Sequence, residues 1–232
     1  MFWTFVEATP ALGGSVQIEG KRGHHLARVL RVRPRERGVA VFAGREYDLE
    51  VVAVEGERID ARVLTDRPAR GEPATAVRLL QAVLPNPDFD AVLEGGTAVG
   101  IQRFVAVQAA RSVGHPPTGR LRRWEAIVES AAEQSHRGEI PTVTGPLTLA
   151  SALEAATDSR LLALDPSASM PLAHAIDGSA AYTIAVGPEG GWTEDERSLL
   201  GSRGAVSVNL GPRILRARLA SVVAAAILVQ RP

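Results

Sequence analysis

Two short glycine-containing segments in the last fifth of the sequence hold residues whose types and spacing could bind a ligand. The first, GPEGG (187–191), follows the apolar run 181–186 and precedes a predicted helix that Thr193 and Glu196 could cap as a capping box. Glycines let the backbone approach a ligand closely, and such loops at the carboxyl ends of parallel strands are common ligand sites. Taken alone, these residues also fit a tight turn without a ligand.

The second segment, NLGPRILR (209–216), again leads from a predicted strand into a predicted helix. Pro212 is expected at the first helical position. Free N–H groups at the start of that helix would suit a carboxylate or a phosphate, and Arg213 and Arg216 would place positive charge beside it. We therefore expect the two strand-to-helix turns to converge on one pocket.

Several other kinds of chemistry do not fit the sequence. The chain has no cysteine, which excludes disulfides, thiolate metal sites and a cysteine nucleophile. Neither glycine segment matches G-x-G-x-x-G, and the only lysine, Lys21, is too far away in sequence for a P-loop. The five histidines have no metal-ligand spacing, so we expect no metal. Glu129 and Glu133 lie one helical turn apart, but an exposed helix face explains this spacing better than an acid–base pair.

A second group of functional residue types lies near the N-terminus. Residues 21–37 contain seven basic residues and two histidines but only one acid, although the formal net charge of the chain is zero. Arginine-rich stripes of this kind are typical of contacts to nucleic-acid phosphates, while a charged surface without a ligand is the alternative. We predict that RNA is bound by Lys21, Arg22, His25, Arg28, Arg31 and Arg33.

The elements that must hold these residues divide into two parts. In the first part, short β-branched segments predict strands of a small β-barrel over 38–44, 46–56 and 57–66. One helix is predicted over about residues 23–32. The segment 66–75, with two prolines and a glycine, predicts a linker. We expect a domain boundary there, with domains over 1–70 and 71–232.

Beyond the linker, apolar runs and amphipathic segments alternate, which predicts an α/β domain around a mostly parallel sheet. Strands are predicted over 76–84, 103–109, 160–165, 181–187 and 205–211. Helices are predicted over 88–100, 121–137, 149–157, 193–203 and 213–230. The last helix is almost wholly apolar after Leu219, so it needs burial on several sides, either inside the domain or in a subunit interface.

The composition agrees with an ordinary globular protein, since 45% of the 232 residues are hydrophobic and 22% are charged. No run approaches the roughly 20 apolar residues of a membrane-spanning helix. The first residues, MFWTFVEATP, lack the basic and then apolar order of a signal peptide. We therefore expect a cytoplasmic protein with no membrane segment.

Five segments, taken in order, resemble the bacterial 16S ribosomal RNA uridine N3-methyltransferases of the SPOUT class: HHLARVLRVRPRE, LQAVLPNPDFD, RRWEAIVESAAEQSHRGEIP, VGPEGGWTEDE and LGPRILR. The resemblance runs through nearly the whole chain. It implies an N-terminal PUA-like barrel that helps to bind RNA, and a C-terminal α/β domain with a deep trefoil knot. It also implies a homodimer that binds S-adenosylmethionine in the knot and methylates one uridine in the decoding region of the small ribosomal subunit.

The resemblance also implies roles for single residues. S-adenosylmethionine would be held largely by backbone and apolar contacts at Leu164, Val186, Gly187, Gly190, Gly191, Leu210, Gly211, Ile214 and Leu215. Arg216 is our candidate for stabilising the negative charge that develops as uridine N3 loses its proton. Attack by a ring nitrogen agrees with the absence of cysteine, because methylation at pyrimidine C5 ordinarily uses a cysteine nucleophile.

The sequence departs from the usual pattern of that family at three places. Asn86 replaces a lysine, Ala98 and Val99 replace Glu-Leu, and Arg218 and Leu219 replace Glu-Thr. Two alternatives therefore stay open: an RNA-binding or ribosome-assembly protein without catalysis, and a SPOUT methyltransferase acting on another RNA, such as transfer RNA. The sequence does not identify the target nucleotide, the state of the substrate as free RNA or assembled subunit, or the group that takes the N3 proton.

Overall fold

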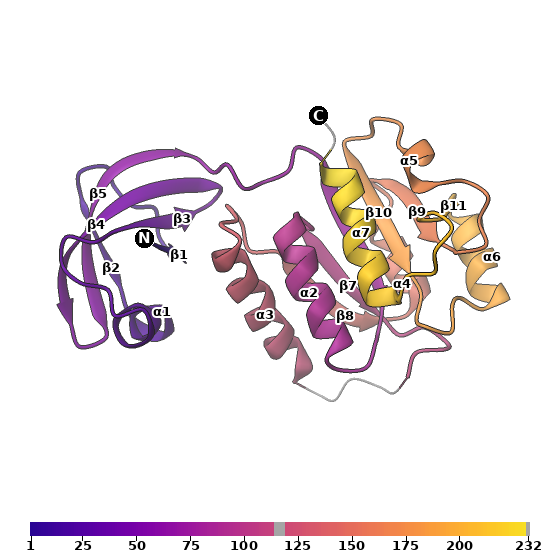
Figure 1. Ribbon diagram of the computed structural model, residues 1–232, viewed down its shortest axis with the longest axis horizontal. Helices are drawn as coiled ribbons and strands as arrows, with labels where there is room; N and C mark the ends of the chain where they lie inside the picture. Colours follow the sequence, from indigo (N-terminus) through magenta and orange to yellow (C-terminus); the bar gives the residue numbers. More distant parts are fainter. Residues whose placement is uncertain (114–118, 231–232) are drawn as a thin grey trace. The chain divides into compact units, whose positions relative to one another are not determined.

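A computed structural model of the chain describes residues 1–113 and 119–230, which form two compact units (Figure 1). Unit 1 contains residues 1–72 and 132–139, and unit 2 contains the remaining described residues. A second, later segment of the chain thus belongs to the N-terminal unit. Within the described ranges, no helix is long and apolar enough to cross a membrane.

Unit 1 is built on a five-stranded sheet with the order β1-β3-β4-β5-β2. β1 runs parallel to β3, and the other neighbours are antiparallel. The strands are β1 (Phe2–Phe5), β2 (Ser15–Ile18), β3 (Arg37–Phe42), β4 (Arg45–Glu55) and β5 (Arg58–Pro68). The three predicted strands are confirmed, and β5 continues into the predicted linker. β1 and β2 were not predicted, because four residues are too few to show a periodic pattern. A closed PUA-like barrel stays a prediction.

The predicted helix of unit 1 is displaced and irregular. It consists of α1 (Gly20–His24) and a π-helical turn over His25–Val29. It therefore begins three residues before the predicted start at residue 23 and ends before residue 32. Leu26 anchors the turn in the core of unit 1, where it packs with apolar residues of the sheet.

Residues 132–139 are tied to the N-terminal residues of unit 1 by polar contacts. The Arg137 side chain is almost fully buried, and its Nη2 lies 2.7 Å from Oε2 of Glu72. The other carboxylate oxygen of Glu72 accepts a hydrogen bond from the Gly138 N–H at 2.9 Å. The ring of His136 stacks on Trp3 with 4.5 Å between the ring centroids. This segment therefore completes the packing of unit 1.

Unit 2 contains a six-stranded sheet in which all neighbouring strands are parallel. Its order is β11-β9-β10-β6-β7-β8. The strands are β6 (Ala76–Ala82), β7 (Arg103–Val107), β8 (Thr142–Leu147), β9 (Arg160–Leu164), β10 (Ala181–Val186) and β11 (Val206–Val208). β6, β9 and β10 are almost wholly buried, as expected for central strands covered on both faces. The predicted parallel α/β architecture is confirmed.

Helices cover both faces of this sheet (Figure 1). The helices are α2 (Asp88–Val99), α3 (Arg120–Gln134), α4 (Leu149–Glu154), α5 (Leu172–Ala175), α6 (Glu194–Ser202) and α7 (Ala217–Val229). Side chains of α2, α3 and α7 join one apolar cluster, and side chains of α4 and α6 join another. α7 packs on α2, β10 and β6, so its apolar sequence serves the interior of unit 2.

Two elements of unit 2 were not predicted, and each has a local reason. β8 contains Gly145 and Pro146, which normally interrupt strands, but it lies at an edge of the sheet where proline is tolerated. α5 has only four residues, which is too short for a helical pattern.

Candidate functional site

The loops that follow β9, β10 and β11 meet at one edge of the sheet of unit 2. Leu164, the last residue of β9, pairs with Val208, the last residue of β11. Ala163 pairs with Ala185, one residue before the end of β10. Since the three strands are parallel and in register, their carboxyl ends lie side by side. Both glycine segments therefore start from the same edge of the sheet.

These loops and the start of α7 line a pocket that encloses about 780 Å³, including the solvent at its mouth. Eight residues predicted to bind the cofactor line this pocket: Leu164, Val186, Gly187, Gly191, Leu210, Gly211, Ile214 and Leu215. Gly190 and Arg216 are not among the lining residues. The two segments thus converge as expected.

Arg213, expected to place positive charge beside the ligand, also lines the pocket. Four further lining residues with charged or aromatic side chains were not predicted: Asp165, Glu189, Trp192 and Arg197. Glu189 and Trp192 lie within or beside the first glycine segment, so their proximity to the pocket could have been expected. Asp165 directly follows β9, and its position at the carboxyl end of a parallel strand was the available signal.

Two glycines of the GPEGG turn line the pocket, and each position favours glycine for a different structural reason. Gly191 has a φ of 70°, and its N–H donates to the carbonyl of Pro188 at 2.8 Å, which closes a tight turn. Gly187 instead packs against the buried indole of Trp192, where an added Cβ would lie 3.2 Å from the ring. Glycine at 187 therefore allows the turn to lie close to Trp192.

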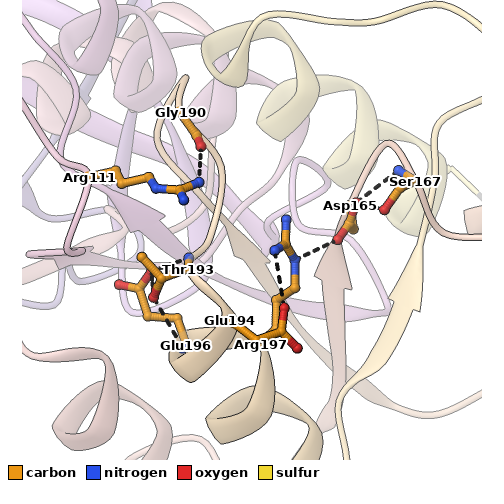
Figure 2. Close-up of polar contacts among 8 residues, drawn as sticks. All are labelled: Arg111, Asp165, Ser167, Gly190, Thr193, Glu194, Glu196 and Arg197. Carbon is orange, nitrogen blue, oxygen red and sulfur yellow. Dashed lines mark hydrogen bonds and ion pairs between the residues drawn. The ribbon is translucent and has the colours of Figure 1, made fainter.

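Contacts from a distant segment fix the outer side of the turn (Figure 2). Nη1 of Arg111 donates to the Gly190 carbonyl at 2.7 Å. Glu196 accepts from the Ala110 N–H at 2.8 Å with one oxygen and from the Thr193 N–H at 2.8 Å with the other. The predicted capping box of Thr193 and Glu196 is confirmed. The residues after β7 thus hold Gly190, which explains why Gly190 faces Arg111 and not the pocket.

The predicted start of the last helix was wrong. α7 begins at Ala217, four residues after the predicted start at residue 213, and Arg216 is its N-cap residue. Pro212 therefore precedes the helix, and the loop before it contains Gly211 with a φ of 95°. The Ala217 N–H donates to Oε1 of Glu189 at 3.2 Å. At this position a carboxylate of the protein takes the place that we had expected a ligand anion to occupy.

The arginines around this helix start have different surroundings. Arg213 lines the pocket and is exposed, and Arg216, three residues later, is exposed as well. Arg218 pairs with Asp88 at the start of α2, with 2.9 Å between Nη1 and Oδ1. This ion pair balances the positive charge that replaces the acid usual in the family which the sequence resembles.

An ionised carboxylate pairs with an arginine on another wall of the pocket (Figure 2). Oδ1 of Asp165 accepts from the Ser167 N–H at 2.8 Å, and Oδ2 accepts from Nε of Arg197 at 3.1 Å. Burial raises the pKa of Asp165, but the hydrogen bonds from Ser167 and Arg197 outweigh it, so the pKa lies below its usual range. The carboxylate therefore carries its charge at neutral pH.

The predicted RNA-binding residues all lie in unit 1. Lys21 and Arg22 belong to α1, and His25 and Arg28 belong to the π-helical turn, while Arg31 and Arg33 lie in the loop that follows. All of them are exposed except Arg22, whose side chain is 24% exposed. Nη1 of Arg22 lies 3.7 Å from Oε1 of Glu7, and its Nε lies 3.8 Å from Oε1 of Glu133. Within the described ranges, no group of three His, Asp or Glu side chains could hold a metal ion.

The parallel sheet and its paired loops define a methyltransferase domain of the SPOUT class. The chain belongs to the RNA methyltransferase domain family, whose model matches residues 71–229. Ribosomal RNA small subunit methyltransferase E of Mycobacterium bovis is 36% identical over 236 residues, which cover 95% of this chain and 88% of that protein. The protein of the same name from Bacillus subtilis is 27% identical over 89% of this chain and 86% of its own length.

Solved structures agree with this assignment. The crystal structure of ribosomal RNA small subunit methyltransferase E from Neisseria gonorrhoeae, bound to S-adenosylmethionine, has a TM-score of 0.91 and 28% identity and covers 97% of this chain and 95% of its own. A methyltransferase from Legionella pneumophila, with 21% identity over 98% of this chain and 96% of its own, has a TM-score of 0.90 and shares the fold.

Proposed function

We propose that the chain is an S-adenosylmethionine-dependent methyltransferase that methylates N3 of one uridine in 16S ribosomal RNA. The observation that carries this proposal is the pocket between the two glycine segments, in a chain 36% identical to a ribosomal RNA small subunit methyltransferase E. The N3 position and the decoding-region uridine come from the resemblance of the sequence motifs.

The lining of the pocket suits S-adenosylmethionine in its chemistry. Aliphatic side chains of Leu164, Val186, Leu210 and Leu215 would cover the apolar surface of the ligand. Gly191 in the first segment and Gly211 in the second have open space where a Cβ would lie. Backbone groups at these two positions could therefore approach the polar groups of the ligand.

The residues of the chain have distinct tasks in the proposed reaction. S-adenosylmethionine supplies a methyl group bonded to a positively charged sulfur. Uridine N3 must lose its proton and form the new N–C bond as the S–C bond breaks, with that electron pair passing to sulfur. Arg216, with Arg213 at the pocket wall, would stabilise the negative charge on the uracil ring. Holding N3 in line with the methyl group is the principal task of the pocket.

RNA binding is assigned to six basic residues of unit 1, namely Lys21, Arg22, His25, Arg28, Arg31 and Arg33, of which all but Arg22 are exposed. The small ribosomal subunit is the proposed substrate and the cytoplasm the proposed location.

A homodimer is the proposed assembly. Ile214, at the pocket, is 86% exposed, and Leu219, on α7, is 49% exposed. Exposed aliphatic side chains beside a ligand pocket favour cover by a second copy of the chain. The measurement is light scattering after size exclusion: Leu219→Arg should shift the dimer toward monomer, whereas a wild-type monomer at micromolar concentration would contradict this assembly.

The decisive experiment is transfer of a labelled methyl group from S-adenosylmethionine to small ribosomal subunits that lack the modification. Mass spectrometry of the nucleosides should identify 3-methyluridine. A protein that binds the cofactor but does not modify these subunits would act on another RNA. A protein that binds RNA but no cofactor would be a binding protein without catalysis.

A further inference from the structure

Two exposed apolar side chains lie in the middle of the basic residues of unit 1. Val29 is 60% exposed and Leu30 is 50% exposed, and we call this pair the apolar tip. Their neighbours Leu26 and Val32 are 1% and 6% exposed and anchor both ends of the same segment in the core of unit 1. The segment thus has apolar side chains for its own packing and presents two more to solvent.

The backbone holds the apolar tip in a fixed conformation. The Leu30 N–H donates to the His25 carbonyl, and the Val32 N–H donates to the Leu26 carbonyl, both at 3.0 Å. Between them Arg31 has a φ of 54°, in the left-handed region that residues other than glycine rarely adopt. Because hydrogen bonds on both sides impose this conformation, the backbone itself holds the apolar tip in its exposed position.

Three arginine side chains beside the apolar tip, those of Arg28, Arg31 and Arg33, differ from the arginines of the sheet. On β4 and β5, Arg45, Arg58, Arg62 and Arg67 each pair with a carboxylate. By contrast, the side chains of Arg28, Arg31 and Arg33 form no hydrogen bond or ion pair with any residue in the described ranges. The hydrogen bond from His24 chiefly lowers the pKa of Glu57, and the charge of Arg28 helps to lower it. The surface around the apolar tip therefore combines arginine side chains that form no ion pair within the described ranges with exposed apolar surface.

We propose that the apolar tip contacts an unpaired base of the RNA substrate while the flanking arginines bind its phosphates. This inference rests on the proposed function, because it takes RNA as the partner. Phosphate binding alone explains the arginines but gives no reason for two exposed aliphatic side chains. Bases in single-stranded loops and bulges are accessible and present apolar faces, whereas a regular RNA duplex presents mainly phosphates and 2′-hydroxyls. The partner surface is thus an RNA loop or bulge and not a duplex.

The test compares Val29→Ser/Leu30→Ser with Val52→Ser, which alters an equally exposed valine, also 60% exposed, on β4 of the same unit. The probe is a 16S ribosomal RNA hairpin with an unpaired loop, and fluorescence anisotropy gives the dissociation constant at several salt concentrations. The tip variant should bind about tenfold more weakly, because the base loses its apolar contact. The salt dependence should not change, because no charge is removed. Val52→Ser and Leu30→Met should bind as the wild type does.

Four results would overturn the inference. Unchanged affinity of the tip variant would show that no base rests on Val29 and Leu30. Equal wild-type affinity for the hairpin and for a fully paired duplex of the same length would remove the unpaired base from recognition. Altered self-association with unchanged RNA affinity would assign the apolar tip to a protein interface. If the wild type binds neither RNA at low salt, the proposed RNA surface fails and this inference with it, whereas cofactor binding in unit 2 still tests the methyltransferase proposal separately.

Discussion

Charged side chains at the pocket of unit 2 and at the apolar tip of unit 1 differ in how many contacts they form within the protein. Around the pocket, Arg111, Glu189 and Glu196 bind backbone groups, and Asp165 pairs with Arg197. At the apolar tip, the exposed side chains of Arg28, Arg31 and Arg33 form no hydrogen bond or ion pair in the described ranges. The pocket is thus fixed before any ligand arrives, which favours tight binding of a small molecule. The apolar tip leaves its charges available for a large, highly charged partner.

The largest expected effect comes from removing the positive charges beside the apolar tip. Arg28→Gln, Arg31→Gln and Arg33→Gln together should weaken RNA binding on the order of 100-fold at low salt, because three charged contacts to phosphate are lost. The slope of log K against log salt should become less steep by roughly two. Arg62→Gln is the matched control, since Arg62 is 57% exposed but pairs with Glu50. Equal effects of the triple and control variants would contradict a special role for unpaired arginines.

The next effect concerns the rigidity of the pocket. Gly187→Ala should lower the free energy of unfolding by about 1–3 kcal/mol, because the added methyl group presses on Trp192. Gly201→Ala is the control, because that glycine lies in α6 and its Cβ would meet no atom within 4 Å. Alanine there should be neutral or stabilise the fold by up to about 1 kcal/mol. Chemical denaturation measures both, and a destabilisation of the same size at both positions would exclude packing against Trp192 as the cause.

A smaller effect tests the link between the glycine turn and α7. Glu189→Ala should cost about 1 kcal/mol of stability, since the Ala217 N–H loses its acceptor. Cofactor affinity should fall roughly fivefold, because Ala217 also lines the pocket. Glu189→Gln keeps an acceptor oxygen and should restore most of both losses. Asp195→Ala, in the first turn of α6, is the control, because Asp195 is exposed and does not line the pocket. Normal cofactor affinity but lost methyl transfer in Glu189→Gln would instead assign the carboxylate to the N3 proton.

The smallest effect is a dependence on pH. The pKa of Asp165 is lowered in the folded state, so this carboxylate stabilises the fold above the usual aspartate pKa of about 4. That contribution is lost as the pH falls through the lower folded-state pKa. Asp165→Asn should therefore reduce the loss of stability in acid and also weaken cofactor binding.

Asp177→Asn separates these two consequences. Hydrogen bonds from Ser179 and Tyr182 outweigh burial and lower the pKa of Asp177 to about 2, but this residue does not line the pocket. The control variant should change the acid stability of the fold without changing cofactor affinity. Thermal unfolding between pH 2 and pH 7, at constant ionic strength, makes the comparison. If both variants weaken cofactor binding equally, Asp165 has no particular role at the pocket wall.

Local patterns were sufficient for much of this fold. Alternating apolar runs identified β6, β7, β9, β10 and β11, and the spacing of Thr193 and Glu196 identified the start of α6. Convergence of the two glycine segments was also predictable, because each follows a parallel strand.

Contacts between distant residues were not predictable from local patterns. Arg111 and Gly190 are 79 positions apart, and Glu189 and Ala217 are 28 apart, so neither contact leaves a local signal. The start of α7 was misplaced because Pro212 is compatible with a first helical turn, while the carboxylate that caps the helix comes from another loop. The predicted trefoil knot likewise depends on the path of the whole chain and stays a prediction.

The segment 132–139 has a consequence for synthesis on the ribosome. Domains generally begin to fold as soon as their residues leave the exit tunnel, with N-terminal domains first. Glu72, however, can pair with Arg137 only after 65 further residues have been made. Trp3 likewise cannot stack on His136 until that residue has been made. A nascent chain that ends shortly after residue 72 therefore exposes surfaces that only the middle of the chain can cover. The N-terminal unit is therefore complete only after the chain has been made through residue 139.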